Sequence, residues 1–216
     1  MRKLISVPFV LALLAAIALG AGVAAAQDMV KTHIGHVTTS FKDTPNMQGL
    51  LPTALAEAKI AAQHAALALK SEGNLAQMQL HAGHVINAID PMIEMKGPGL
   101  GYGVKKAAAG VAQHISLAAK VEGASKNVMT HSNHVATAAN NVVQWSDEIL
   151  SVAKELRSAT TAEAAAPLAA RLNTLASQLT TGVDADKNGQ VGWQAGEGGL
   201  QQAEMHMNLL LKGEGV

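Results

Sequence analysis

Three histidine pairs share one spacing in this chain, and each pair is followed by valine. They are His33 with His36, His81 with His84, and His131 with His134. Residues three apart lie on the same face of an α-helix, so both imidazoles of a pair can approach one ion. Neutral imidazole is a ligand that zinc, copper and nickel accept. The spacing therefore points first to transition-metal binding.

Two of these pairs lie inside a repeat that aligns residues 61–88 with residues 111–138 without a gap. His64 matches His114, and a glycine break at Gly73 matches Gly123. A repeat at fixed spacing indicates a repeated structural unit. Each copy has the pattern of two helices joined at the glycine. The sequence therefore predicts two helical hairpins.

Folding each hairpin at its glycine predicts which histidines meet. His64 lies nine residues before Gly73, and His81 lies eight after it. At 1.5 Å per residue, both stand about 12–13 Å from the turn, level with each other. We therefore expect His64 beside the pair His81 and His84. The same reasoning places His114 beside His131 and His134, with His33 and His36 adding ligands to one of the two sites.

The histidine pattern is compatible with three interpretations. Three imidazoles from facing helices suit Zn²⁺, Cu²⁺ or Ni²⁺ with one position left for water or a fourth ligand. Two facing imidazoles would instead clamp haem b, as helical bundles do. In the third reading the histidines are a buried polar seam, hydrogen-bonded to Gln63, Gln113, Asn87 or backbone. Met205, His206 and Met207 add a possible soft ligand set for Cu(I), although methionine at helical spacing is commonly core filling.

An acidic stretch near the C-terminus resembles the first nine positions of an EF-hand calcium loop. It runs from Asp184 to Gly192, with Asp186 and Asn188 at alternate positions, Gly189 at the sharp turn and Gln190 after it. The resemblance implies a calcium site with ligands Asp184, Asp186, Asn188 and Gln190. The family has a glutamate at the twelfth position, where this chain has Ala195. Either Glu197, two residues later, reaches back, or water fills the gap. A metal-free turn rich in Asx residues is the alternative.

The first 26 residues have the pattern of a secretory signal peptide. Arg2 and Lys3 precede an apolar run that ends in Ala24, Ala25 and Ala26. We expect cleavage after Ala26 and a periplasmic or secreted protein, with an uncleaved anchor as the alternative. No later run is long and apolar enough to cross a bilayer, so no membrane association is expected after signal removal. Cysteine is absent, which excludes thiolate zinc sites and covalent c-type haem.

Composition predicts an all-α fold. Alanine dominates and aromatic residues make up only 2% of the chain, which favours closely packed helices over strands. Apolar spacing predicts seven helices, over residues 27–41, 53–73, 74–90, 104–122, 124–157, 160–179 and 200–212. Together they form an antiparallel bundle. We expect one domain over residues 27–216, with the histidine repeats in 27–158 and a helix–loop–helix in 160–216. The glycine-rich stretch 96–103 reads as a turn between repeats, because no strand precedes it.

These features favour a binding protein over an enzyme. The chain has no H-E-x-x-H, no E-x-x-H and no G-x-S-x-G sequence. Acidic and basic residues are equal in number at 16 each, and no basic patch suggests nucleic acid. The expected function is storage, delivery or sensing of a transition metal or haem, with a degenerate calcium site. The alternative is a structural or interaction module that binds calcium alone.

Overall fold

The computed structural model describes residues 26–215 and confirms an all-helical antiparallel bundle. An N-terminal helix over residues 26–38 is followed by a short 3-10 turn, η1 (Pro45–Met47), and then α2 (Leu50–Lys70), α3 (Leu75–Ile89) and α4 (Val104–Lys120). The chain continues through α5 (Lys126–Ser158), α6 (Ala162–Thr181) and α7 (Leu200–Glu214). The predicted signal peptide falls on residues outside this range, apart from Ala26. Among the described residues, no helix is long and apolar enough to span a membrane.

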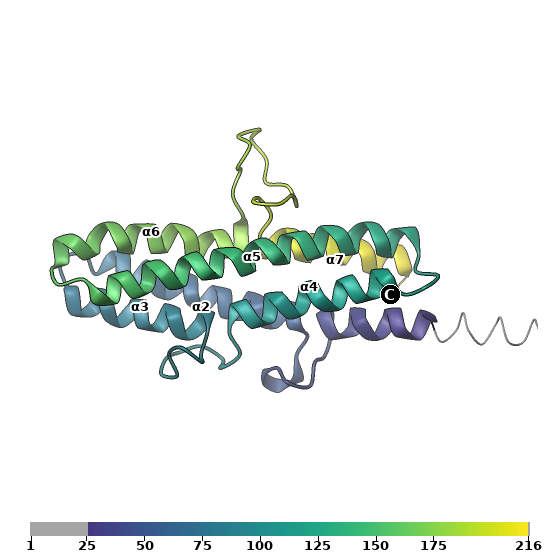
Figure 1. Ribbon diagram of the computed structural model, residues 1–216, viewed down its shortest axis with the longest axis horizontal. Helices are drawn as coiled ribbons and strands as arrows, with labels where there is room; N and C mark the ends of the chain where they lie inside the picture. The colour runs from purple at the N-terminus through teal and green to yellow at the C-terminus, as the bar shows by residue number, and fades with distance from the viewer. Residues whose placement is uncertain (1–25, 216) are drawn as a thin grey trace, which may run out of the picture.

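The longest helix, α5, organises the bundle, since α3, α4, α6 and α7 all pack against it. Figure 1 shows α6 and α3 along one half of α5, and α7, α4 and the N-terminal helix along the other. The predicted hairpins α2–α3 and α4–α5 are both present, and α6 and α7 flank a long loop. The two predicted halves of the chain therefore share one bundle.

Alanine builds the packing surfaces, as the composition predicts. Five alanines of α2 are fully buried at intervals of three or four residues: Ala54, Ala58, Ala61, Ala65 and Ala68. Small side chains at this spacing let helix axes approach closely, and the larger residues of neighbouring helices fill the remaining space.

Side-chain caps begin α3 and α6. Asn74 accepts a hydrogen bond from the backbone of Gln77, and Thr161 accepts one from Ala164. The helix α2 begins at Leu50, three residues before the start expected at residue 53. Pro52 lies in the first helical turn, where a missing N–H costs nothing, and Thr53 donates its hydroxyl to Gly49 O at 2.8 Å.

The glycine-rich turn between α3 and α4 is held by a buried carboxylate. Glu57 of α2 is fully buried and accepts hydrogen bonds from the backbone N–H groups of Leu100, Tyr102 and Gly103 at 2.9–3.0 Å. Gly103 has φ of 87° and leaves no room for a Cβ beside Ile89 O. The turn is thus part of the scaffold that sets α4 against α2.

Candidate metal centres

Nine histidines of the described chain gather into three clusters of three. They are His33, His36 and His114; His64, His81 and His84; and His131, His134 and His206. Within each cluster the three candidate ligand atoms lie within 4.8 Å of one another. Every cluster joins one H-x-x-H pair to a single histidine from another helix.

The same ring atom forms the contacts in all three clusters. His114 Nδ1 lies 3.1 Å from His33 Nδ1 and 3.3 Å from His36 Nδ1. His64 Nδ1 lies 3.1 Å from His81 Nδ1 and 3.2 Å from His84 Nδ1.

His206 Nδ1 repeats this geometry, at 3.1 Å from His131 Nδ1 and 3.4 Å from His134 Nδ1. Three equal arrangements at separate places in one bundle indicate one local design used three times.

Hydrogen bonding alone does not satisfy this arrangement. A ring nitrogen has a single in-plane position, which holds either a proton or a lone pair. The central Nδ1 of each cluster faces two other Nδ1 atoms but can form a good hydrogen bond with only one of them. An ion bound to all three nitrogens uses every lone pair at once.

The spacing matches a tetrahedral ion. Zinc–nitrogen bonds of 2.0–2.1 Å at the tetrahedral angle separate the two nitrogens by about 3.3–3.4 Å. The six central contacts run from 3.1 to 3.4 Å. Three nitrogens supply three corners of the tetrahedron, and the fourth corner is free for water or another ligand.

The α2–α3 hairpin brings together the histidines that the sequence predicts. His64, His81 and His84 form the second cluster, across the turn at Gly73. The buried face of α2 is the row of alanines. Ile60 and Leu67 are only partly buried, and His64 is half-buried at the edge of the helix contact.

The expectation for the second hairpin is wrong, because His114 lies with His33 and His36 and not with His131 and His134. The two turns differ in length. Residues 71–74 join α2 to α3, whereas residues 121–125 join α4 to α5. Val121 leaves the helical conformation and Ser125, not Ala124, caps α5. Because the repeats align without a gap, the longer turn means that α5 begins one residue later than α3, and one residue corresponds to about 100° of helix rotation.

His206 completes the third cluster, whereas the sequence analysis named it only beside Met205 and Met207 and did not place it with His131 and His134. A signal for it exists, since residues 203–215 form a third copy of the first half of the repeat. His206, Lys212, Glu214 and Gly215 stand at the spacing of His64, Lys70, Glu72 and Gly73. The chain thus holds three first halves and three H-x-x-H-V second halves. Met205 is exposed and Met207 is buried, so the two flanking sulfurs do not share a face.

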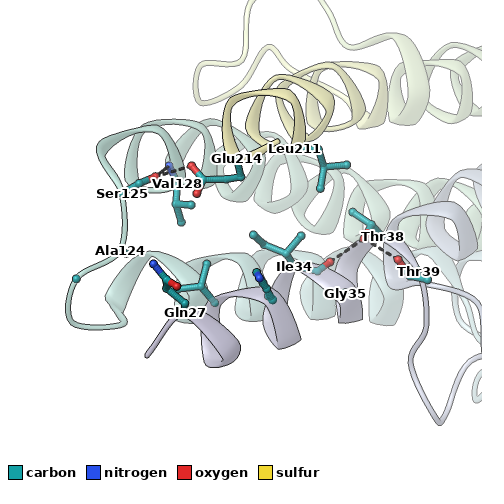
Figure 2. A pocket seen from close by; sticks show the side chains of 13 residues that line it. Gln27, Ile34, Gly35, Thr38, Thr39, Ala124, Ser125, Val128, Leu211 and Glu214 are labelled. Atoms are coloured by element: carbon teal, nitrogen blue, oxygen red, sulfur yellow. Dashed lines mark hydrogen bonds between the residues drawn. The ribbon is translucent and has the colours of Figure 1, made fainter. Parts of the chain in front are cut away.

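All three histidine pairings repeat the antiparallel geometry of a hairpin, even where no turn joins the helices. The start of the N-terminal helix lies beside the end of α4, because Gln27 and Gly123 line one pocket. The end of α7 lies beside the start of α5, since Ser125 and Asn127 donate hydrogen bonds to Glu214. In Figure 2, Gln27, Ser125 and Glu214 surround this pocket, and Ile34 and Leu211 form its apolar wall.

Six of the cluster histidines have a lowered pKa. Burial is the larger cause and neighbouring histidines lower the pKa further; the six are His33, His64, His81, His114, His134 and His206. For His206 the pKa falls to about 4, from burial first and then from His134 and His131. Neutral imidazole is the form that binds a metal, so the lowered pKa values favour the binding form of these six histidines.

The acidic loop between α6 and α7 also gathers its carboxylates. Oxygens of Asp184, Asp186 and Glu197 lie within 4.8 Å of one another. Glu197 is 95% buried, and its carboxylate accepts hydrogen bonds from the backbone of Asp186 and Gly192. The carboxylate of Glu197 therefore lies with those of Asp184 and Asp186.

The other two predicted calcium ligands, Asn188 and Gln190, carry no carboxylate. Asn188 Oδ1 accepts a hydrogen bond from the backbone of Gln190 at 2.8 Å, and Asn188 Nδ2 donates to Asp186. Gln190 is exposed. The cluster of close carboxylates thus consists of Asp184, Asp186 and Glu197.

Comparison with protein-family models, curated proteins and solved structures finds no match to this chain. The functional argument therefore depends on the geometry of the chain itself.

Proposed function

We propose that this protein binds transition-metal ions, one in each of its three histidine clusters. The single observation that carries the proposal is the spacing of the Nδ1 atoms. In each of the three clusters, the central Nδ1 lies from its neighbours at the distance that separates two ligands of a tetrahedral ion. Zinc and copper are the first candidates, followed by nickel, because imidazole suits all three.

The polar-seam alternative has less support. It requires hydrogen bonds from the histidines to glutamine, asparagine or backbone. Among the described residues, the hydrogen bonds of the cluster histidines join only other histidines. Gln63 and Gln113 are exposed, and Asn87 is bonded to Glu94 O and to the Gly99 N–H.

A haem also fits these clusters poorly. Its macrocycle has to lie beside or between the ligating rings. In each cluster two imidazole nitrogens lie within 3.4 Å of the nitrogen of the third, which leaves no space for that plane. A single ion satisfies the geometry without movement.

The role we propose is storage or delivery outside the cytoplasm. Eight of the nine cluster histidines are half-buried, which leaves a bound ion open to exchange. The signal-peptide pattern of the first 26 residues supports a periplasmic or secreted location.

Metal content tests the proposal directly. Untagged protein should bind three equivalents of Zn²⁺ or Cu²⁺ by elemental analysis after equilibrium dialysis. Replacing one central histidine, as in His64→Ala, should lower the content to two. Gln63→Ala, at the neighbouring exposed position, is the matched control and should keep three. Full-length folded protein that binds none of these metals would overturn the proposal.

A second ion, calcium, is favoured by the buried carboxylate of Glu197 beside Asp184 and Asp186. We propose that this loop binds Ca²⁺ with Glu197 in place of the missing twelfth-position ligand. Hard carboxylate oxygens on a turn are the ligands that calcium prefers. Calcium should raise the melting temperature, and Asp184→Ala should abolish the rise. No rise in the unaltered protein would refute the calcium site.

A further inference from the structure

Among the described residues, an aromatic ring stacks face to face on a histidine only at the third histidine cluster. The indole of Trp193 stacks on the imidazole of His134, with ring centroids 3.8 Å apart and planes inclined by 18°. Trp193 belongs to the loop between α6 and α7, which projects from the side of the bundle in Figure 1. A residue remote in sequence from α5 thus lies flat against one of its candidate ligands.

A buried amide holds this loop on α5. Asn141 is only 3% exposed and stands two helical turns after His134. Its side chain donates to Gln194 O at 2.8 Å and to Gly198 O at 3.0 Å, and accepts from the Gly196 N–H at 2.8 Å.

A second contact holds the other side of the loop. Gln202 Nε2 donates to Val191 O at 2.7 Å. Hydrogen bonds therefore fix the backbone on both sides of Trp193, so the stacked position of its indole is built into the loop.

The other clusters are less covered. At the first cluster, Phe41 meets His36 and His114 edge-on, with centroids 5.4 Å and 5.2 Å away. At the second cluster, the only ring contacts among described residues are between the histidines themselves.

Burial follows the same order. His206 of the third cluster is 7% exposed, whereas the single histidine of each other cluster, His64 or His114, is half-buried. The coverage is therefore graded, with the third cluster the most enclosed.

We propose that Trp193 closes the third cluster, so that an ion held by His131, His134 and His206 exchanges more slowly than an ion in the other two clusters. The inference rests on the proposed metal function. Release requires an imidazole to rotate away from the ion or a competing ligand to enter. The stacked indole opposes the rotation of His134, and the enclosed position of His206 limits entry. Trp193 acts as a positioning residue, not as a ligand.

Release kinetics test this proposal. Full-length protein loaded with Zn²⁺ is mixed with excess chromophoric chelator, and release is followed by absorbance. We expect two faster equivalents and one slow equivalent. His206→Ala should remove the slow phase alone, which assigns it to the third cluster. Trp193→Ala should accelerate the slow phase about 2- to 10-fold, the factor that corresponds to loss of one aromatic contact.

Two further variants separate closure from a general loss of structure. Asn141→Ala loosens the loop without touching a histidine and should accelerate the same slow phase. Phe41→Ala is the matched aromatic control and should leave that phase unchanged. Trp193→Phe should lie between the unaltered protein and Trp193→Ala.

The outcomes are distinguishable from failure of the metal function itself. An unchanged slow rate in Trp193→Ala, with three ions still bound, overturns the closure and leaves metal binding intact. A slow phase that survives in His206→Ala also overturns it. Absence of bound metal in the unaltered protein removes both proposals.

Discussion

Acidification should destabilise the metal-free protein through His206. The pKa of His206 is about 4 in the folded chain against an ordinary 6.5. Between pH 6.5 and pH 4, His206 is therefore less protonated in the folded state than in the unfolded state. Its contribution to stability is complete above pH 6.5 and is lost as pH drops from 6.5 toward 4.

The size follows from the shift. Each pKa unit corresponds to about 1.4 kcal/mol, so the full effect of His206 is about 3 kcal/mol. Between pH 7 and pH 4.5 we expect His206 alone to remove about 2 kcal/mol from the free energy of unfolding. Other cluster histidines with lowered pKa values act in the same direction.

Urea unfolding of dialysed, chelator-treated protein at pH 7.0, 5.5 and 4.5 measures this effect. His206→Gln provides the comparison, because it removes the titrating group and leaves the carboxylates unchanged. The two proteins should differ in their pH slope by about 2 kcal/mol over this range, whatever the offset at pH 7. Equal slopes would refute the assignment of a strongly lowered pKa to His206.

Three further outcomes follow from the fold. Adding Zn²⁺ at one hundred times its dissociation constant should stabilise the protein by about 2.7 kcal/mol for each occupied cluster, seen as a rise in melting temperature; no rise would contradict binding to the folded state. Glu57→Ala should cost about 3 kcal/mol or more in denaturant unfolding, because it leaves three backbone N–H groups, two of them in buried hydrogen bonds, without an acceptor. A loss under about 1 kcal/mol would refute that role. Gly73→Ala should lower the free energy of unfolding by about 1 kcal/mol, because Gly73 has φ of 85°. Gly35→Ala should raise it by a similar amount, because Gly35 lies inside a helix with open space around it. Equal effects of the two substitutions would contradict the argument.

The sequence was sufficient for the helices and for one cluster. Helix positions follow from apolar spacing and caps such as Asn74 and Thr161, which act within a few residues of themselves. The second cluster was predictable for the same reason, since one turn at Gly73 fixes how His64 meets His81. Local rules suffice where a short turn determines the contact.

The remaining clusters depend on helix packing, which local rules do not determine. The turn after α4 is one residue longer than the turn after α2, and His131 and His134 meet His206 of α7 instead of His114 of α4. Their partner, His206, lies about 70 residues later, and packing of α7 on α5 brings it there. The third copy of the first half-repeat, in α7, could be recognised in the sequence. Its pairing with α5 could not, because a long segment without repeat character separates the two helices.

The order of the half-repeats has a consequence for how the chain could be connected. The N-terminal helix carries an H-x-x-H-V second half of the repeat, and α7 carries a first half of the repeat. Gln27 and Glu214 line the same pocket, so the two ends of the described chain lie close together (Figures 1 and 2). A short linker from residue 215 to residue 26, with the chain opened between residues 39 and 49, would give a circular permutant. In that permutant every first half would precede a second half, and α7 would run directly into the helix that carries His33. We expect it to fold and to keep all three clusters, because none of their contacts requires the present connection between the N-terminal helix and α2.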